Sequence, residues 1–506
     1  MSSAGQRPDR AAIEAQQSQK RQQEMALAAE RQQTGQRPRR PAALPNSLSA
    51  YATVAEEQQA REEAVSGQIR VLRRELPALL EQLEQIPDPR NPNKCRHRLH
   101  VLLLYGLLMF VLQFASRREA NRKMTHPCFE ANLKLLFPEL DTLPHADTLY
   151  RLLRNIDVTH LEEAHVDVVK RLIRGKHFRR YLINHAYPIA IDGSQKFDRD
   201  TLWDENLLER QVGPEDARHP QYYVYVLEAS LAFHNGLVIP LLSEFLEYGQ
   251  GNVEANKQDC ELRAFTRLSE RLKALFPRLP ILLLLDGLYA NGPLMQRCRQ
   301  NHWQFMIVLK DKSLPTVWEE FHALDAWQPH RFRQNWGDRR QDFRWVNAIS
   351  YSFTQGGRHH LKLNLLVCDE SWEKVDSQGN TVTKTARHAW LSSQPLSQHN
   401  VHERGNLAAR HRWGIEAGFL VEKHQGYHYE HAFALDWNAM KGYHALMRLA
   451  HLFNVLARFA RHLREFYRKF GVRGTIAFIR SSCSGPWFDP VRMRYLLEQP
   501  FHLQLE

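Results

Sequence analysis

The sequence predicts a mixed α/β protein in which helices pack against a sheet, with helical regions on either side. Between residues 186 and 310, short apolar runs alternate with helical periodicity, in the order strand, hairpin, helix, strand, helix, strand. The run ILLLLDG at 281–287 is continuously apolar, which is typical of a strand buried on both faces. Residues 65–185 and 436–506 instead carry apolar residues at helical spacing.

The composition favours a basic protein with a large core. The 506 residues include 68 Lys and Arg against 56 Asp and Glu, an excess that favours a polyanionic partner such as nucleic acid, although many basic proteins bind none. A mean hydropathy of −0.52 excludes a polytopic membrane protein. Six cysteines without a CxxC pair exclude a disulfide scaffold and a clustered zinc site, and they fit a reducing cytoplasm. The polar N-terminus predicts no secretory signal peptide.

The first 64 residues differ from the rest in composition. They are rich in Gln, Arg, Ala and Glu and poor in large apolar residues, so we expect a disordered, basic, Gln-rich tail over 1–64, with a transient helix at 18–33. This tail is either a solvated extension or an arm that contacts DNA phosphates. A helix at 67–86 follows, and then the proline-rich IPDPRNPNKC.

Residues 65–185 are expected to form a helical, DNA-binding region. The uncharged run 99–116 approaches the length of a membrane span, but it contains His100 and Gln113, and we interpret it as a buried helix. Residues 144–174 predict two helices joined by a short turn, with Asp147 or Thr148 as the first cap. This pair is either a helix-turn-helix DNA reader or an ordinary helical hairpin.

Arg117 and Arg118 follow the apolar helix directly. They are either DNA contacts or a solvated helix end.

The predicted sheet begins with the strand YPIAI and continues with a hairpin around Asn235-Gly236. A helix at 256–276, the strand at 281–287, a helix at 291–301 and a strand at 303–310 complete residues 186–310. Residues 311–394 carry several short β-like runs and predict a β-rich insertion. One helix returns between about 400 and 424, within 395–435. The C-terminal region, 436–506, is expected to be helical, with one long helix at 435–469.

Two aspartates stand at equivalent places in this pattern. Asp192 follows PIAI and Asp286 follows ILLLL, and each is followed by glycine. Active sites gather at strand ends in open α/β sheets, and a carboxylate placed there needs a cation or a positive neighbour. An Asp-Gly pair is also an ordinary signal for the end of a strand.

A third charged feature lies in the segment AARHRWGIEAGFLVEKHQGYHYEHAF. On a helix, Glu416 is about 40° and Lys423 about 20° from Arg412, so the three side chains share one face. This face suits a metal-binding acid flanked by two cations that hold phosphate oxygens. It equally suits an exposed Arg–Glu ion pair with a solvated lysine.

These segments together resemble the DDE transposases of bacterial insertion sequences, in the branch whose third acid lies in a YREK signature. Arg412, Glu416 and Lys423 match three letters of that signature, and Ala409 stands at the tyrosine position. IAIDGS and LLLLDGLYANGPLMQRC resemble the first and second aspartate motifs, and IPDPRNPNKCRHRLHVLLLYGLLMFVLQFAS resembles the N-terminal segment of related transposases. The resemblance spans roughly 85–470.

The resemblance implies a ribonuclease H-like core, interrupted by the β-rich insertion before the glutamate helix. It implies that Asp192, Asp286 and Glu416 are catalytic and hold two Mg²⁺ ions, about 3.5–4 Å apart, with Mn²⁺ as a substitute. One ion would activate water or a DNA 3′-hydroxyl, and the other would stabilise the leaving oxygen. Arg412 and Lys423 would position phosphates. Tyr427, Glu430 and His431, which follow the signature, either support the site or form a packed turn.

The implied activity is strand cleavage at the ends of a mobile element and strand transfer into target DNA. The implied partners are double-stranded DNA, as terminal repeats and as target, and a second copy of the chain in a homodimer on paired ends. No membrane partner is expected, and the location would be the cytoplasm of a bacterium, with the nucleoid. Two alternatives are a related nuclease that cuts without joining and an inactive DNA-binding repressor. No Walker A loop, GxGxxG, GxSxG or HExxH motif occurs, which argues against nucleotide-dependent enzymes, α/β-hydrolases and zinc hydrolases.

Overall fold

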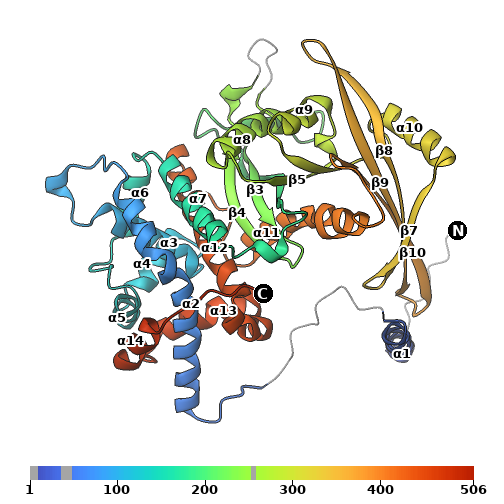
Figure 1. Cartoon of the computed structure of the whole chain (residues 1–506). Helices are drawn as coiled ribbons and strands as arrows, with labels where there is room; N and C mark the ends of the chain where they lie inside the picture. Colours follow the sequence, from blue (N-terminus) through green and yellow to red (C-terminus); the bar gives the residue numbers. More distant parts are fainter. Residues whose placement is uncertain (1–9, 36–47, 252–257) are drawn as a thin grey trace. The chain divides into compact units, whose positions relative to one another are not determined.

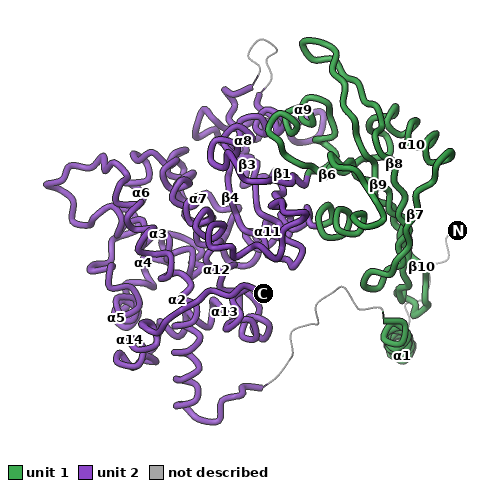
Figure 2. Tube along the Cα trace, in the orientation of Figure 1, with its two compact units in different colours: residues 1–43, 285–410 green, residues 44–284, 411–506 purple. Residues whose placement is uncertain are grey.

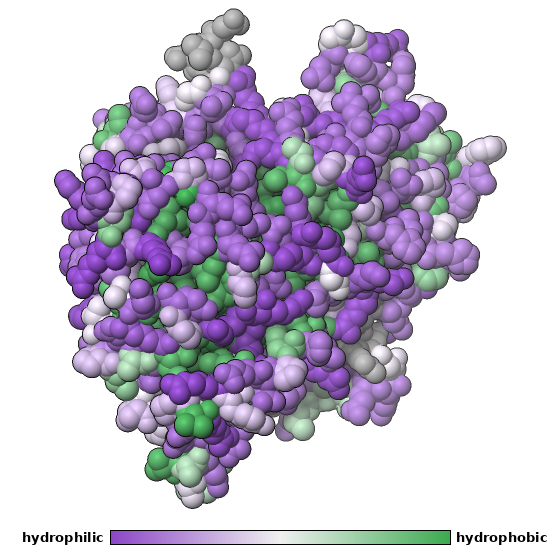
Figure 3. Space-filling view, turned by 60° about the vertical axis from the view of Figure 1, so that its left-hand side comes forward, coloured by the Kyte–Doolittle hydropathy of each residue, from purple (hydrophilic) through white to green (hydrophobic). Residues whose placement is uncertain are grey.

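The computed structural model describes the chain except for residues 1–9, 36–47 and 252–257 (Figure 1). The chain divides into two compact units (Figure 2). Unit 1 comprises residues 1–43 and 285–410, and unit 2 comprises residues 44–284 and 411–506. Hydrophilic side chains dominate the face shown in Figure 3, and apolar residues lie between them.

Unit 2 contains the first part of the predicted sheet. Its strands are β1 (Tyr187–Arg199), β2 (Leu208–Val212), β3 (His219–Ala232), β4 (Val238–Phe245) and β5 (Ile281–Leu285). The strand β3 pairs antiparallel with β1 along one edge and with β2 and β4 along the other, and β5 joins the far edge of β1 in parallel. The helix α8 (Glu261–Leu275) connects β4 to β5 and packs on β4 (Figure 1). The antiparallel strands β1, β3 and β4, the helix α8 and the parallel strand β5 have the order expected for a ribonuclease H-like mixed sheet, and β2 adds a further antiparallel strand beside β3.

The apolar runs explain why these segments are strands. All five residues of β5 are buried, as expected for a strand covered on both faces, and the first five residues of β1 are buried as well. The predicted hairpin is confirmed, because β3 and β4 flank a turn in which Gly236 adopts a φ of 86°.

The remaining elements of unit 2 are helical. They are α2 (Val54–Glu84), α3 (Leu99–Val111), α4 (Arg117–Met124), α5 (Pro127–Leu136), α6 (Ala146–Leu153), α7 (Thr159–Arg174), α11 (Trp413–His424), α12 (Trp437–Phe459), α13 (Arg464–Ser484) and α14 (Pro490–Glu498). Every residue of α3 except His100 is buried, and α3 packs against α2, α6 and α12. The apolar run is therefore a core helix, as predicted. In the described part of the chain, no helix is both long and apolar enough to span a membrane.

Unit 1 holds the β-rich part of the chain. Its strands β6 (Gln304–Val308), β7 (His330–Trp336), β8 (Arg339–Thr354), β9 (Arg358–Val375) and β10 (Thr381–Ser392) are antiparallel and follow the order β6-β10-β9-β8-β7. Its helices are α1 (Arg10–Gln33), α9 (Gly292–Gln300) and α10 (Pro315–Trp327). The insertion is β-rich as expected, but it also contains α10, which the sequence analysis did not anticipate.

Several expectations about individual elements were wrong. Residues 10–33 form the helix α1 rather than a disordered tail, because Ala, Gln, Glu and Arg favour a helix and Arg31 donates to the Glu373 carbonyl. The rest of the expected tail at 1–9 and 36–47 lies outside the described residues, and α2 already begins at Val54. The cap of α6 is His145, whose ring accepts from the Asp147 N–H. The expected helix at 435–469 breaks at Ala460, which is extended and pairs with Leu505.

Candidate active site

Asp192 lies inside β1 and not at its end, which corrects the sequence-based expectation. The parallel pairing of β1 with β5 stops at Ala190, opposite Leu284, but β1 continues to Arg199 because β3 remains hydrogen-bonded to its other edge. Asp192 therefore stands two residues beyond the last residue of β1 that pairs with β5, opposite Glu228 of β3.

The glycine after this aspartate allows a close approach. A Cβ atom at Gly193 would lie 2.5 Å from the Tyr225 ring, so only glycine leaves room for that ring beside Asp192. The Tyr225 hydroxyl donates to Glu261, at 2.7 Å, and this hydrogen bond anchors the ring. The Asp-Gly pair thus serves packing here and not a turn.

Arg412 brings Asp192 and Glu416 together. It is the last residue before α11, and Glu416 lies in the first turn of that helix. The Arg412 Nη2 donates to Glu416 Oε1 at 2.6 Å, and its Nη1 lies 3.4 Å from Asp192 Oδ2. The Arg412 side chain is only 9% exposed, whereas those of Asp192 and Glu416 are 21% and 40% exposed. The pair of Arg412 with Glu416 is therefore not the solvated surface pair considered above, since a buried guanidinium joins carboxylates from two elements.

Asp286 follows β5 directly, as predicted. Its Oδ1 accepts from the Leu288 N–H at 2.9 Å, so it caps the short 3₁₀ helix Gly287–Tyr289. The division into units assigns Asp286 to unit 1, whereas Asp192, Arg412 and Glu416 belong to unit 2. Asp286 stands two residues after Leu284, the last residue of β5 that pairs with β1.

The donor set of this site fits a hard divalent cation. Asp192 and Glu416 direct oxygens at one shared guanidinium, so two carboxylates already converge on one position of positive charge. Carboxylate oxygens are the ligands that Mg²⁺ prefers. Among the described residues, no three or more His, Cys, Asp and Glu side chains form a ready metal cluster. In this structure the cation between the two acids is Arg412.

Lys423 lies at the other end of α11. Its Nζ is 3.2 Å from Glu430 Oε1 and 5.8 Å from the centre of the Tyr429 ring. Tyr427 is buried, and its hydroxyl accepts from Asn454 Nδ2 at 2.9 Å. Of the residues after the signature, Tyr427 thus belongs to a packed turn and Glu430 is the ionic partner of Lys423.

Arg117 and Arg118 begin α4, whose first turn is held by two side-chain hydrogen bonds. The Ser116 hydroxyl accepts from the Glu119 N–H, and the Glu119 carboxylate accepts from the Ala115 N–H. Arg117 packs over the Tyr150 ring at 4.6 Å, whereas Arg118 is exposed. Both arginines line a cavity of about 630 Å³. Arg118 is therefore the better placed of the two for contact with a partner.

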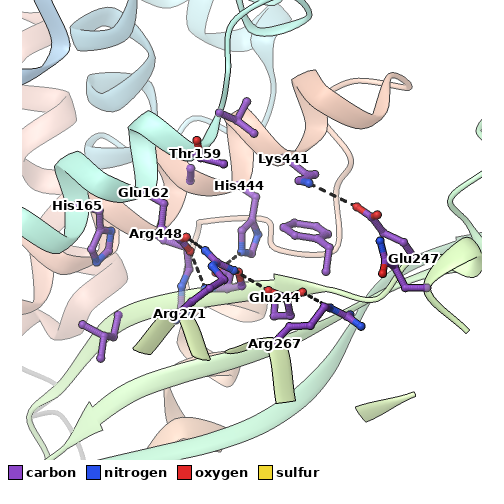
Figure 4. A pocket seen from close by; sticks show the side chains of 16 residues that line it. Thr159, Glu162, His165, Glu244, Glu247, Arg267, Arg271, Lys441, His444 and Arg448 are labelled. Atoms are coloured by element: carbon purple, nitrogen blue, oxygen red, sulfur yellow. Dashed lines mark hydrogen bonds and ion pairs between the residues drawn. The ribbon is translucent and has the colours of Figure 1, made fainter. Parts of the chain in front are cut away.

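Sequence reasoning missed a buried ionic network beneath α11. The carboxylates of Glu228 on β3 and Glu422 on α11 are fully buried, and Arg448 of α12 lies between them, at 3.2 and 2.9 Å (Figure 4 shows Arg448). His444 lies 3.0 Å from Glu228, and His451 lies 2.6 Å from Glu422. The network ties the helix that carries Glu416 to the strand opposite Asp192 and to α12.

The electrostatics of the network follow from burial and pairing. Burial raises the pKa of Glu422, but the charges of Arg448 and His451 outweigh it and lower that pKa to about 2. Burial lowers the pKa of the Lys196 ammonium to about 8, against the opposing attraction of Glu228 and Glu422. The Lys196 ammonium donates to the Tyr429 carbonyl at 2.7 Å. The buried acids are thus held as carboxylates by fixed positive neighbours.

A signal for this network exists in the sequence. His444, Arg448 and His451 recur at spacings of four and three residues within an otherwise apolar helical face. Charged side chains on such a face are rarely buried unless they are paired, so this pattern predicts ionic partners on neighbouring elements. The residues that provide the partners, Glu228 and Glu422, have no comparable pattern.

Comparison with known proteins gives a match to a family model over part of the chain and similarity to solved structures. Residues 80–169, from the end of α2 into α7, match the model of the family described as DDE_Tnp_1-associated. The chain is also similar to a solved structure described as the cryo-EM structure of a piggyBac transposase synaptic complex with hairpin DNA. That likeness has a TM-score of 0.33 at 11% identity and covers 83% of this chain and 82% of the other. No curated protein matches the chain.

Proposed function

We propose that this protein is a DDE transposase that cleaves DNA at the ends of its element and joins those ends to target DNA, with Mg²⁺ as cofactor. The observation that carries the proposal is the meeting of Asp192 and Glu416 through Arg412. Asp192 lies on a strand and Glu416 on a helix, and the two residues are far apart in the chain. An ordinary surface ion pair does not need two acids from such distant elements to share one guanidinium. The match of residues 80–169 supports the same assignment.

Asp192, Glu416 and Asp286 would hold the metal. When bound, Mg²⁺ supplies positive charge that stabilises charge developing on phosphate oxygens. The three carboxylates supply hard oxygen ligands, and Tyr225 and Gly193 fix the backbone beside Asp192. The buried network of Glu228, Glu422 and Arg448 fixes the helix that carries Glu416.

Arg412 would change partners when DNA binds. Its guanidinium now neutralises the two carboxylates, but a guanidinium also binds phosphate through two parallel hydrogen bonds. A backbone phosphate that takes Arg412 leaves the carboxylates to bind metal. Arg412 would therefore position the phosphate and couple metal binding to DNA binding.

Further parts of the proposal concern assembly. Lys423, and Arg118 with Arg117, would hold DNA phosphates outside the catalytic centre. Two chains would act as a homodimer on paired element ends. A nuclease that only cuts, and an inactive DNA-binding repressor, are the two other candidates.

Cleavage of labelled donor ends with Mg²⁺ tests the proposal. The wild type should give nicked donor ends and joined target products, and Asp192→Asn, Asp286→Asn and Glu416→Gln should each abolish both while DNA binding persists. Glu465→Gln, a change at an acid that is 74% exposed on α13, is the matched control and should cleave normally. Nicks without joining would indicate the nuclease, binding without cleavage the repressor, and full activity of the three variants would refute the assignment.

A further inference from the structure

A second cavity in unit 2 has the chemistry of an anion site. It has a volume of about 280 Å³ and lies where the ends of α3 and α11 meet α4 and α13. The polar residues that line it include Gln113, Glu119, Lys423, His428, Arg473 and Arg480. This volume is just below the usual range of about 300–1,000 Å³ for small-molecule sites, which suits a group as small as a phosphate.

The lining carries an excess of positive charge. Lys423, Arg473 and Arg480 are cationic, and among the described lining residues Glu119 alone is acidic. The Glu119 carboxylate is committed to its own helix, since Oε2 accepts from the Ala115 N–H at 2.8 Å. Its Oε1 lies 3.8 Å from Arg480 Nη1. Lys423 is paired with Glu430, which lies outside the lining, at 3.2 Å. With Glu119 beside Arg480, the described lining offers no acid to balance the charge of Arg473.

The backbone around the cavity is held in unusual conformations. Gln113 and His428, two lining residues, adopt φ values of 54° and 52°, in the left-handed region that non-glycine residues rarely occupy. Gly426 lies between the same walls at a φ of 105°, and a Cβ there would be 2.5 Å from Gln113 Oε1. The Arg480 Nη1 donates to the Gln113 carbonyl at 3.1 Å and fixes this turn. Such conformations persist where the surroundings enforce them, and they cluster at ligand-binding sites.

We propose that this cavity binds a backbone phosphate of the DNA substrate. Lys423 is seven residues after Glu416 on α11, so the cavity lies about 10 Å along the helix from the catalytic acid. That distance equals the rise of about three nucleotides of one strand. Arg473, Arg480 and Lys423 bind the phosphate oxygens, without reading the base sequence. The inference rests on the proposed function and adds a place on the protein where the strand is held.

Salt-dependent DNA binding tests the inference. Arg473→Gln removes an exposed charge that lines the cavity, and Arg468→Gln, on the same helix, removes one that is 78% exposed and lies outside the lining. We expect Arg473→Gln to weaken binding of a labelled donor duplex about five- to tenfold at 0.1 M salt and to reduce the slope of log K against log salt by about 1. Arg480→Gln should act in the same direction, and Arg468→Gln should leave both quantities unchanged.

Each outcome separates the cavity from the catalytic assignment. If the wild type binds and cleaves DNA but Arg473→Gln and Arg480→Gln keep the wild-type affinity and slope, the cavity inference is wrong and the proposed function stands. If calorimetry shows that inorganic phosphate binds and Arg473→Gln removes that binding, while the DNA slope is unchanged, the cavity takes free phosphate and the inference is again wrong. A wild type that neither binds nor cleaves donor DNA would overturn both.

Discussion

Arg448 is the residue whose removal should weaken unit 2 most. Its guanidinium lies between two carboxylates that are 0% exposed, those of Glu228 and Glu422, and Arg448→Met would leave both without their shared cation. Removing one partner of a buried ion pair costs about 3–5 kcal/mol. Since His444, His451 and Lys196 remain to share the charge, we expect a loss of about 4 kcal/mol.

Calorimetric melting at pH 7 measures this loss. With an unfolding entropy of about 2.1 cal/mol/K per residue over roughly 340 residues of unit 2, a loss of 4 kcal/mol lowers Tm by about 6 °C. Arg468→Met is the control, because its ion pair with Glu465 is exposed and should be worth less than about 0.5 kcal/mol. Combining Arg448→Met with Glu228→Gln and Glu422→Gln should recover part of the loss, since no buried carboxylate then lacks its cation, although Lys196 loses the two acids that attract it. If Arg448→Met melts within about 1 °C of the wild type, the network does not hold α11 in the way described.

Three further outcomes are expected. Burial lowers the pKa of His165 to about 4, so only the unfolded chain takes up its proton between pH 6.5 and 4, and stability should fall by about 3 kcal/mol as the pH drops through that window. Denaturant titration of wild type and His165→Gln should show a shallower pH slope in the variant, and equal slopes would contradict the assignment. Arg412→Gln should tighten Mn²⁺ binding about tenfold in calorimetry without DNA, because two charge-assisted hydrogen bonds no longer compete for the carboxylates, whereas unchanged or weaker binding would count against that competition. Gly193→Ala should reduce cleavage and Mn²⁺ affinity together, because its Cβ would displace the Tyr225 ring beside Asp192, and a wild-type result for both would show that the close approach is not needed.

Local patterns in the sequence predicted much of the sheet and part of the site. The apolar run 281–285 identifies β5, because burial on both faces restricts a strand to apolar residues. The Asn235-Gly236 turn identifies the β3–β4 hairpin, because a positive φ favours glycine. The spacing of Arg412 and Glu416 in the signature also predicted a pair that the structure contains, since Arg412 Nη2 lies 2.6 Å from Glu416 Oε1. Its interpretation as a metal ligand with phosphate-binding neighbours stays a prediction.

Other features depend on contacts that no local pattern encodes. The polar residues after Asp192 look like the end of a strand, but β3 extends β1 to Arg199 by hydrogen bonding on its other edge. Ala460 interrupts an apolar helical pattern because Leu505, near the end of the chain, pairs with it. The buried acids Glu228 and Glu422 were missed because only the fold reveals their shared partner on α12.

The proposed function depends on a single divalent-metal centre held by Asp192, Asp286 and Glu416. Iron-directed cleavage of the polypeptide tests it most directly, because Fe²⁺ bound in place of Mg²⁺ reduces added hydrogen peroxide to hydroxyl radicals that cut the backbone nearby. In the presence of donor DNA, we expect cuts near residues 192, 286 and 416, all three lost in Asp192→Asn and all suppressed by excess Mg²⁺. Cuts confined to one of these segments, or an unchanged pattern in Asp192→Asn, would contradict it.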